Sequence, residues 1–378
     1  MIPREFLLGG LPQESCAPAE GVHKRELRRA PGGRAGGRGR PPRRRRAGPP
    51  RARARGGMEG PPTGPPGPPG APVRAPGRRL GARLAGWASS SAGLLDLRPS
   101  PEFALRALRG STSVPAAQLP GRWLELPPRE RPFALLVPCG APLALPTKAG
   151  SAHKWDLTDV FESSQALWEE AEALGLLYVP GPADSGVPLW RPCPLLAEHL
   201  PEIERRAAFA GGNRRKNLEC LDVGCGAGRD TVFLASRGHH VRALDVRRPQ
   251  LERLAAFAER SACARNVTCE EVDLRDPASA AAALQAPFHL AVVVRFLHRP
   301  LLAQLAAGLE PGGCLVYEHF LSGSEAVGGP SRPEDRLEPG ELSGLFKRDG
   351  WDLLVADDTG SLPDGRPVSR LVAFKPTI

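Results

Sequence analysis

Apolar runs alternate with helix-like stretches along the C-terminal half of the chain. The helix-like stretches, such as 250–260 and 301–309, carry apolar side chains at intervals of three and four residues, as on the buried face of a helix. The apolar runs have the length of buried strands and lie at 218–223, 241–245, 267–272, 288–294 and 314–318. Strands and helices that alternate in this way predict a parallel sheet covered by helices on both faces.

A similar pattern begins at residue 85. Strands are predicted at 94–97, 133–137 and 176–179, and helices at 101–108 and 163–174. Residues 183–216 are rich in proline and charge and form a connector. In this connector, Trp190 is expected to pack against the following domain, and residues 195–209 are expected to form a helix. The chain is therefore expected to contain two α/β domains.

The first 80 residues are dominated by Arg, Gly and Pro, and this tail is expected to be disordered because it has too few apolar side chains to offset the entropy of folding. Three roles are left open for this tail: a solvated leader, an organelle-targeting leader, or a segment that attaches to nucleic acid through its arginines. It is also left open whether translation starts at Met1 or at Met58. The net charge of +10 arises here, because residues 1–57 carry +11 and the rest of the chain −1. Charge therefore gives no indication that the globular part binds nucleic acid.

The eight cysteines are irregularly spaced and include no C-x-x-C pair, which is typical of reduced thiols inside the cell and predicts no metal site. No apolar run approaches the roughly 20 residues of a membrane span. We therefore expect an intracellular protein without membrane attachment, mainly cytoplasmic, with the nucleus and the mitochondrion left open. The oligomeric state is also left open.

A glycine-rich turn, Gly224-Cys225-Gly226-Ala227-Gly228, links the strand at 218–223 to a helical stretch at 231–236. Glycine adopts positive φ and has no Cβ, so a ligand can approach the backbone closely. A strand, a glycine turn and a helix N-terminus together form a cradle for a nucleotide cofactor. The G-x-G-x-G spacing differs from the G-x-G-x-x-G of dinucleotide-binding turns, which argues against a nicotinamide cofactor.

An acidic residue follows the next strand at the interval typical of a ribose-binding group. Asp245 lies 21 residues after Gly224, and Val246 follows it. A carboxylate can accept hydrogen bonds from both ribose hydroxyls, whereas the alternative role is a solvated strand end. Asp245 and Val246 are therefore candidate cofactor-binding residues.

With Asp222 directly before it, the glycine turn resembles the S-adenosylmethionine (SAM) loop of class I methyltransferases, and Pro311-Gly312-Gly313 before an apolar strand is a further trait of that family. This resemblance implies a Rossmann-like, seven-stranded sheet. It also implies SAM as cofactor, bound by Asp222, Gly224, Cys225, Gly226, Gly228, Asp245, Val246, Asp273, Leu274 and Arg295. Asp222 would orient the loop and reach the methionine amino group through water. Asp273 would receive the adenine amino group, with Asp276 as a competing candidate.

The end of the chain narrows the resemblance. Over residues 215–376 the chain is similar to tellurite-resistance-type methyltransferases, in the motifs Glu318-His319-Phe320, Leu337-x-Pro339-Gly340-Glu341-Leu342, Gly350-Trp351 and Gly365-Arg366. Such enzymes transfer methyl groups to small acceptors, including chalcogen oxyanions. The resemblance therefore implies a small-molecule acceptor, such as a thiol or a chalcogen oxyanion.

Three residues are candidates for catalysis. Methyl transfer from a sulfonium is an in-line displacement, so the protein chiefly aligns the reactants and excludes water, and a base is needed only if the acceptor must lose a proton. His298 and His319 follow the fourth and fifth predicted strands and are the candidate bases, although a histidine at a strand end is often a structural donor. Arg295 is a candidate for holding an anionic acceptor.

The N-terminal domain resembles rhodanese-like domains in the phrases Asp96-x-Arg98-x-x-x-Glu102-Phe103 and Gly110-Ser111-x-x-Val114-Pro115. In active members of that family a cysteine after the central strand carries sulfur, and Cys139 stands at this position. The following loop, 140–146, has two prolines and no arginine that would stabilise a thiolate. We therefore expect a degenerate domain without sulfurtransferase activity, with a working Cys139 nucleophile as the alternative.

The predicted organisation is a tail (1–80), a rhodanese-like domain (81–182), a connector (183–216) and a class I methyltransferase domain (217–378). The leading hypothesis is a SAM-dependent methyltransferase for a small molecule. The alternatives are a SAM-binding regulatory module without catalysis, and an RNA-directed methyltransferase that uses the tail. No N-P-P-Y-like run follows the fourth strand, which argues against amino-methylation of exposed nucleobases.

Overall fold

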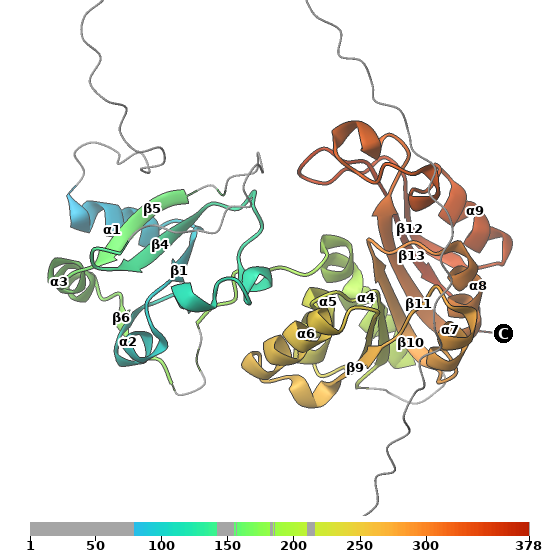
Figure 1. The fold of residues 1–378 in the computed structure, drawn as a ribbon, viewed down its shortest axis with the longest axis horizontal. Coiled ribbons are helices and arrows are strands. Elements are labelled where there is room, and N and C mark those ends of the chain that lie inside the picture. The colour runs from blue at the N-terminus through green and yellow to red at the C-terminus, as the bar shows by residue number, and fades with distance from the viewer. Residues whose placement is uncertain are drawn as a thin grey trace, which may run out of the picture. The chain divides into compact units, whose positions relative to one another are not determined.

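The structure, a computed structural model, describes residues 79–141, 155, 157–181, 184, 186–209 and 216–377. These residues form two larger sheets, each with its own helices, and a third sheet of two short strands (Figure 1). The predicted disordered tail lies outside the described residues except for its last two positions, and so does the loop after Cys139 from residue 142 onward.

The N-terminal sheet has four strands in the order β3-β1-β4-β5, and every neighbouring pair is parallel. Its strands are β1 (Gly93–Asp96), β3 (Ser111–Ser113), β4 (Phe133–Pro138) and β5 (Leu157–Ser163). The helices are α1 (Leu80–Ala88), α2 (Ser100–Leu105) and α3 (Gln165–Ala173), with short 3-10 turns at Ala116–Gln118 and Trp123–Glu125. A separate antiparallel pair joins β2 (Ala107–Leu108) to β6 (Leu177–Tyr178).

This arrangement confirms the predicted strands at 94–97 and 133–137 and the helix at 163–174, each with its boundaries moved by one or two residues. The strand predicted at 176–179 is wrong in its pairing, because only two of its residues are extended and they join β2 instead of the main sheet. Strand β5 was not predicted from the sequence. Its sequence mixes polar and apolar residues, as expected at a sheet edge where only one neighbour covers the strand.

The C-terminal sheet has seven strands in the order β12-β13-β11-β10-β7-β8-β9, as the resemblance implied. Its strands are β7 (Glu219–Val223), β8 (His240–Asp245), β9 (Val267–Glu271), β10 (Phe288–Val294), β11 (Leu309–Phe320), β12 (Asp352–Asp357) and β13 (Val368–Phe374). The helices are α4 (Pro194–Phe209), α5 (Arg229–Ser236), α6 (Arg248–Arg260), α7 (Pro277–Ala283), α8 (Arg299–Gly308) and α9 (Glu341–Arg348). Short 3-10 turns lie at Ala264–Asn266, Ser324–Val327 and Pro333–Asp335.

Strands β7 to β11 are mutually parallel, and β13 is antiparallel to both of its neighbours. The strand order runs outward in one direction from β7 through β8 and β9, and in the other from β10 through β11. In open α/β sheets the point where the order reverses leaves a crevice at the carboxyl ends of the two central strands, where ligands bind. Here those strands are β7 and β10.

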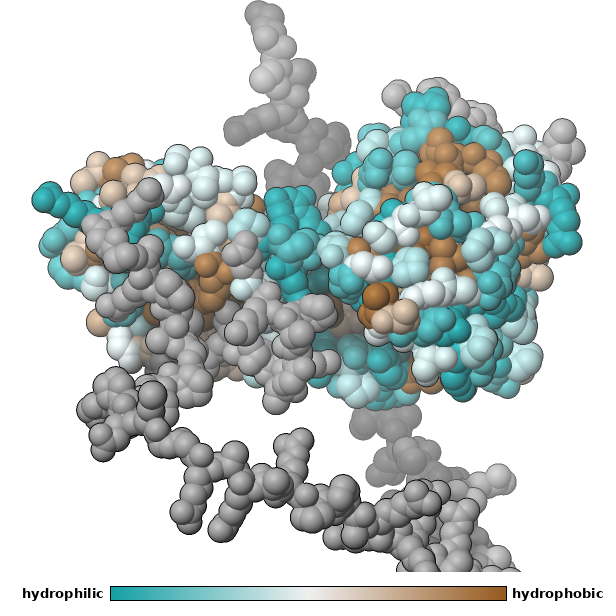
Figure 2. All heavy atoms as spheres, turned by 90° about the horizontal axis from the view of Figure 1, so that it is seen from above, coloured by the Kyte–Doolittle hydropathy of each residue, from teal (hydrophilic) through white to brown (hydrophobic). Residues whose placement is uncertain are grey.

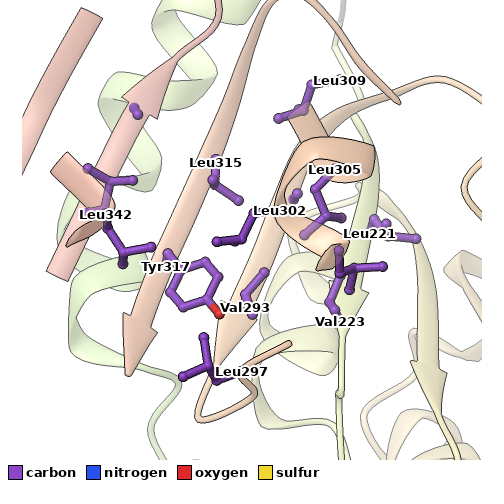
Figure 3. Packing of buried hydrophobic residues seen from close by; sticks show 14 of the residues in the cluster. Leu221, Val223, Val293, Leu297, Leu302, Leu305, Leu309, Leu315, Tyr317 and Leu342 are labelled. Carbon is purple, nitrogen blue, oxygen red and sulfur yellow. The ribbon is translucent and has the colours of Figure 1, made fainter. Parts of the chain in front are cut away.

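The core of this sheet lies on both of its faces, because consecutive side chains of a strand point to opposite sides. On β11, Leu315 and Tyr317 join a cluster with the apolar sides of α7, α8 and α9, and Cys314 and Val316 join one with α4, α5 and α6. Figure 3 shows Leu302 and Leu305 of α8 turned toward the strand residues Leu315 and Val293. This burial on both faces is why the strands read as near-continuous apolar runs.

The Pro-Gly-Gly turn predicted between a helix and a strand is absorbed into β11. Leu309 pairs with Phe288 and Cys314 pairs with Leu290, so four residues of β11 bulge opposite a single residue of β10. Gly312 has a φ of 77°, and a Cβ on Gly313 would lie 2.8 Å from the carbonyl oxygen of Glu310. The bulge therefore requires glycine, and the signal that indicated a turn here marks an irregularity inside one long strand.

Hydrophilic residues occupy much of the visible surface (Figure 2), and the large apolar side chains that are exposed are scattered along the chain. Such isolated exposed apolar residues are ordinary for a globular protein. Among the residues that the structure describes, every helix is too short or too polar to cross a membrane.

The Asp96–Arg98 pair of the N-terminal sheet provides a test of stability. Arg98 Nη2 lies 2.6 Å from Asp96 Oδ2, the two side chains are 2% and 0% exposed, and burial raises the pKa of Asp96. We expect Arg98→Met to lower the free energy of unfolding by about 3–5 kcal/mol in urea denaturation, because it leaves a buried carboxylate without its cation. The double variant Asp96→Asn/Arg98→Met should lose less. A loss below about 1 kcal/mol in the single variant would contradict this account.

Candidate functional site

The glycine turn after β7 is built so that only its middle glycine has space beside it. Gly224, Gly226 and Gly228 have φ values of 69°, 56° and 82°, which favour glycine. A Cβ on Gly224 would lie 2.9 Å from Phe296, and one on Gly228 would collide with Leu254. A Cβ on Gly226 would meet no atom within 4 Å among the described residues. Gly226 therefore presents bare backbone to an open space at the carboxyl end of β7.

A carboxylate lies directly against this backbone. Asp245, the last residue of β8, accepts the Gly226 N–H at 2.9 Å through Oδ2 and the Arg247 N–H at 2.8 Å through Oδ1. The Asp245 residue is 5% exposed. The Arg247 side chain, 61% exposed, also pairs with Asp245, from Nε to Oδ1 at 3.2 Å and from Nη2 to Oδ2 at 3.5 Å. A ligand that bonds to both carboxylate oxygens therefore takes the place of this exposed guanidinium. Val246 beside it is 55% exposed, which suits contact with a flat apolar group.

Two further carboxylates lie near the start of α5: Asp222 of β7 is buried, and Asp230 of α5 is half-buried. Asp222 Oδ2 accepts the Thr231 hydroxyl at 2.5 Å, and Asp230 Oδ1 accepts the Cys193 N–H at 2.6 Å. Burial raises the pKa of Asp222 to about 7, and the nearby charge of Asp230 contributes to this rise. Burial likewise raises the pKa of Asp230 to about 6. Both groups therefore titrate near neutral pH, and a cation bound beside them would favour their ionised forms.

The residues predicted for the adenine side lie just past β9. Asp273 is exposed, and its Oδ1 accepts the Arg275 N–H at 2.9 Å. Leu274 is 3% exposed and packs in the core, so its side chain faces away from any ligand at the sheet edge. The competing candidate Asp276 caps α7, accepting the N–H of Ser279 at 2.8 Å and its hydroxyl at 2.6 Å. Asp273 therefore stays the better candidate of the two carboxylates.

Arg295, directly after β10, belongs to a buried charge network. Its Nη2 lies 2.8 Å from Glu318 Oε1, and Arg370 Nε donates to Glu318 Oε2 at 2.8 Å. Glu318 is 1% exposed, and the Cys193 thiol donates to its Oε1 at 3.4 Å. Burial raises the pKa of the Cys193 thiol, so the thiol keeps its proton. The second nitrogen of Arg295, Nη1, is buried and has no hydrogen-bond partner within the described ranges.

The two histidines differ in their surroundings. His298 is half-buried and stands at the N-terminus of α8 without a capping hydrogen bond from its side chain. His319 is buried, and its Nε2 lies 3.0 Å from the carbonyl oxygen of Asp335. A carbonyl only accepts, so Nε2 carries the proton and Nδ1 presents a lone pair, which is buried and unpartnered in the described part of the chain. Burial lowers the pKa of His319, so the ring is neutral at neutral pH.

Cys139 follows β4 and is exposed, as expected for a residue after a central parallel strand. The loop that would surround it lies outside the described residues from position 142, so the expected loss of sulfurtransferase activity stays a prediction. Within those described ranges, His, Cys, Asp and Glu side chains form no group of three or more that could hold a metal ion.

The structure therefore brings Asp222, Gly224, Cys225, Gly226, Gly228, Asp245 and Arg295 to the carboxyl ends of the central strands. Cys225 lies within the turn, where its N–H donates to the Leu244 carbonyl at 3.0 Å and burial raises the pKa of its thiol. Sequence reasoning missed Cys193 and Arg370, which stand in a proline-rich connector and an antiparallel strand without any motif. Glu318 carried a signal, because it is a lone acidic residue inside an apolar strand.

Residues 220–313 match the family model described as a methyltransferase domain. The match covers β7 to the start of β11 and so includes the glycine turn, Asp245 and Arg295. Residues 220–313 are therefore similar to a methyltransferase domain, and the glycine turn, Asp245 and Arg295 lie inside this match, whereas Glu318 and His319 lie just beyond it.

Comparisons with whole proteins give more distant similarities. The chain is 25% identical to an uncharacterised protein of Schizosaccharomyces pombe over 322 residues, which cover 74% of this chain and 93% of that protein. Residues 1–78 and 216–378 together make up less than two thirds of the chain, which is less than the 74% that is aligned. The alignment therefore includes part of residues 79–215. The similarity to the yeast relative therefore extends upstream of the methyltransferase domain.

Among solved structures, TehB from Haemophilus influenzae is 21% identical with a TM-score of 0.36, covering 46% of this chain and 62% of that one. The N-methyltransferase NodS from Bradyrhizobium japonicum is 17% identical with a TM-score of 0.35, covering 49% of this chain and 98% of that one. The chain spans less than two thirds of the length of TehB.

The carboxyls of Asp222 and Asp230 predict how stability depends on pH. The folded-state pKa values of Asp222 and Asp230 are about 7 and about 6, above the ordinary value of about 4, so both protonated forms are favoured by folding. Their stabilising contribution is complete below pH ~4 and is lost as the pH rises through 6 and 7. We expect the free energy of unfolding of the ligand-free protein to fall by about 2–4 kcal/mol between pH 5 and 8.

Asp222→Asn should remove most of this slope in denaturant titrations at several pH values. Asp276→Asn is the matched control, because Asp276 is exposed and its pKa is lowered by hydrogen bonds from Ser279. That variant should keep the slope of the wild-type protein. A stability that is flat with pH in the wild-type protein would contradict the assignment.

Proposed function

We propose that the protein is a SAM-dependent methyltransferase that acts on a small-molecule acceptor, a thiol or a chalcogen oxyanion. One observation carries the proposal: inside a methyltransferase domain, the bare backbone of Gly226 faces open space with the Asp245 carboxylate beside it. A ribose needs a carboxylate that accepts its hydroxyls, and the chain of atoms that continues from the ribose needs a surface without Cβ atoms. Gly226 meets the second requirement, and Asp245 meets the first once the exposed Arg247 side chain moves aside.

The residues around the turn fit the remaining parts of the cofactor. Val246 is exposed next to Asp245, where an adenine ring can lie against it, and Asp273 stands just past the end of β9. The carboxyls of the buried Asp222 and the half-buried Asp230 supply negative charge at the other end of the turn, as a sulfonium and an amino group require. Arg295 adds a cation at the end of β10.

When bound, SAM supplies a methyl group on a positively charged leaving group, so the protein contributes alignment and exclusion of water. His319 can take part in the chemistry, because its ring is neutral at neutral pH and the Nε2 hydrogen bond to Asp335 holds the Nδ1 lone pair in place. Such a group accepts the proton of a thiol acceptor. An oxyanion acceptor carries no proton to remove, and for it the cation of Arg295 would matter more.

The two alternatives are separated by simple observations. A SAM-binding module without catalysis predicts SAM affinity without turnover of thiols or chalcogen oxyanions. An RNA-directed enzyme predicts salt-sensitive RNA binding that is lost when residues 1–57 are deleted. We favour the small-molecule acceptor because His319 and Arg295, the residues proposed to contact the acceptor, are buried and half-buried, and such positions suit a small ligand better than RNA.

The cofactor site is tested by calorimetry. We expect Asp245→Ala to weaken SAM binding at least tenfold, since it removes the acceptor of the ribose hydroxyls, and Gly226→Val to abolish binding by filling the open space. Gly350→Val is the matched control, because Gly350 also has positive φ, at 75°, and no atom within 4 Å of its Cβ position among the described residues. The control carries a similar backbone cost of about 1–2 kcal/mol but should bind SAM normally. Unchanged affinity in both site variants would refute the placement.

The proposed division of labour between the two sheets is tested at Cys139. We expect Cys139→Ser to leave the rate of methyl transfer unchanged, since the N-terminal sheet region, which we propose is rhodanese-like and degenerate, contributes no sulfur chemistry. Turnover with a thiol acceptor under saturating SAM measures this. A loss of tenfold or more would show that the exposed cysteine takes part in the reaction.

A further inference from the structure

The network around the buried Glu318 lies near the carboxyl ends of β10 and β11. We propose that Glu318 is a positioning residue, a role that rests on the proposed function. It holds the Arg295 guanidinium so that Nη1 binds an anionic oxygen, a carboxylate or another oxyanion, of a bound ligand. Two sources of that oxygen exist: the methyl acceptor, or the carboxylate of the cofactor's own methionine moiety.

The first support is that Glu318 contacts Arg295 at two points. The Glu318 carbonyl oxygen accepts the Arg295 N–H at 2.9 Å, and its carboxylate Oε1 lies 2.8 Å from Arg295 Nη2. These contacts fix both the main chain and the end of the long side chain. An arginine held at both ends has little rotamer freedom left to lose when a ligand binds, which is the effect of preorganisation.

The second support is the backbone of Arg295. Its φ is 61°, in the left-handed region that a residue with a Cβ adopts only at a cost of about 1–2 kcal/mol. This conformation turns the chain immediately after β10, at the strand end where ligands bind in such sheets. A strained residue persists only where the surroundings hold it, and Glu318 supplies two of the contacts that do so.

The third support is the unpaired donor. Nη1 of Arg295 is buried without a partner in the described part of the chain, while Nη2 is engaged by Glu318 and the guanidinium lies 5.0 Å from the centre of the Phe320 ring. A buried N–H of a charged group without an acceptor is costly, so such an atom marks a place where a ligand completes the hydrogen bonds. An arginine donor is best satisfied by an anionic oxygen.

Arg370 keeps Glu318 available for this task. It donates from Nε to Oε2 at 2.8 Å, and its Nη2 donates to the carbonyl oxygen of Ser361 at 3.2 Å. Arg295 therefore pairs with Oε1 of Glu318 and Arg370 pairs with Oε2, so the carboxylate cannot rotate without breaking one ion pair. The Cys193 thiol donates to the same Oε1, which fixes the carboxylate from the connector side.

The test compares four proteins by calorimetry: wild type, Arg295→Lys, Glu318→Gln and Glu204→Gln. Glu204 is the matched control, because it also forms a two-point pair with an arginine, Arg237, at 2.9 and 2.8 Å, but away from the strand ends. Each protein is titrated with S-adenosylhomocysteine, with methylthioadenosine, which lacks the amino-acid carboxylate, and with selenite in the presence of methylthioadenosine.

If the ligand oxygen belongs to the cofactor, Arg295→Lys and Glu318→Gln weaken the binding of S-adenosylhomocysteine about tenfold or more and leave the affinity for methylthioadenosine unchanged. If it belongs to the acceptor, both variants leave the affinities for the two nucleosides unchanged and weaken the binding of selenite by a similar factor. Glu204→Gln changes none of the three affinities. A Glu318→Gln protein that matches wild type on all three ligands, or that weakens methylthioadenosine as strongly as the others, overturns the proposal.

A further variant separates positioning from general stability. Arg370→Met removes one arm of the network but leaves the Arg295–Glu318 ion pair, so we expect an affinity loss of less than threefold where Glu318→Gln loses tenfold. Equal losses in the two variants would mean that the network only supports the fold. Wild-type protein that binds neither nucleoside would instead contradict the proposed function itself, whereas normal wild-type binding with insensitive variants contradicts only the role of Glu318.

Discussion

The hydrogen bond from the Gly226 N–H to the Asp245 carboxylate joins the turn after β7 to the end of β8, and the candidate cofactor site depends on it. The Cys225 N–H, bonded to Leu244, makes a second link between the same two segments. Phe296 and Leu254 close the outer sides of the turn at Gly224 and Gly228. The backbone is therefore held at both ends and open only in the middle, so the space for a ligand exists before any ligand arrives.

The edge of the sheet near this turn is rich in buried carboxyl groups. Asp222 and Glu318 are buried and Asp230 is half-buried, and ionised carboxylates away from water need cations close by. Glu318 has two arginines, whereas the side chain of Asp222 accepts a hydrogen bond from the neutral Thr231 hydroxyl, and its pKa is raised accordingly. The protein therefore retains an excess of acidic groups at this place. A cofactor that brings a sulfonium and an amino group would compensate it, which joins the electrostatics of the site to the proposed function.

Much of the larger sheet could be predicted, because its signals are local. The apolar runs, the glycine turn and the carboxylate 21 residues later lie within short stretches of sequence, and β7, β8 and β10 appear where those runs stand. The sequence predicts a turn at the Pro-Gly-Gly segment, because glycine and proline usually end a strand. The bulge is evident only from the register of β11 against β10. Arg370 and Cys193 could not be predicted, since their contact with Glu318 joins segments 52 and 125 residues apart in the chain. The tautomer of His319 likewise depends on a carbonyl 16 residues away.

The left-handed backbone at position 295 carries a steric cost that the ion pair with Glu318 offsets. Glycine reaches that conformation without this cost of about 1 kcal/mol, but it would leave the buried Glu318 carboxylate with only one of its two arginines, and breaking a buried ion pair costs about 3–5 kcal/mol. A substitution at position 295 therefore alters the fold and the candidate site together, and its effect on affinity is interpretable only beside its effect on unfolding.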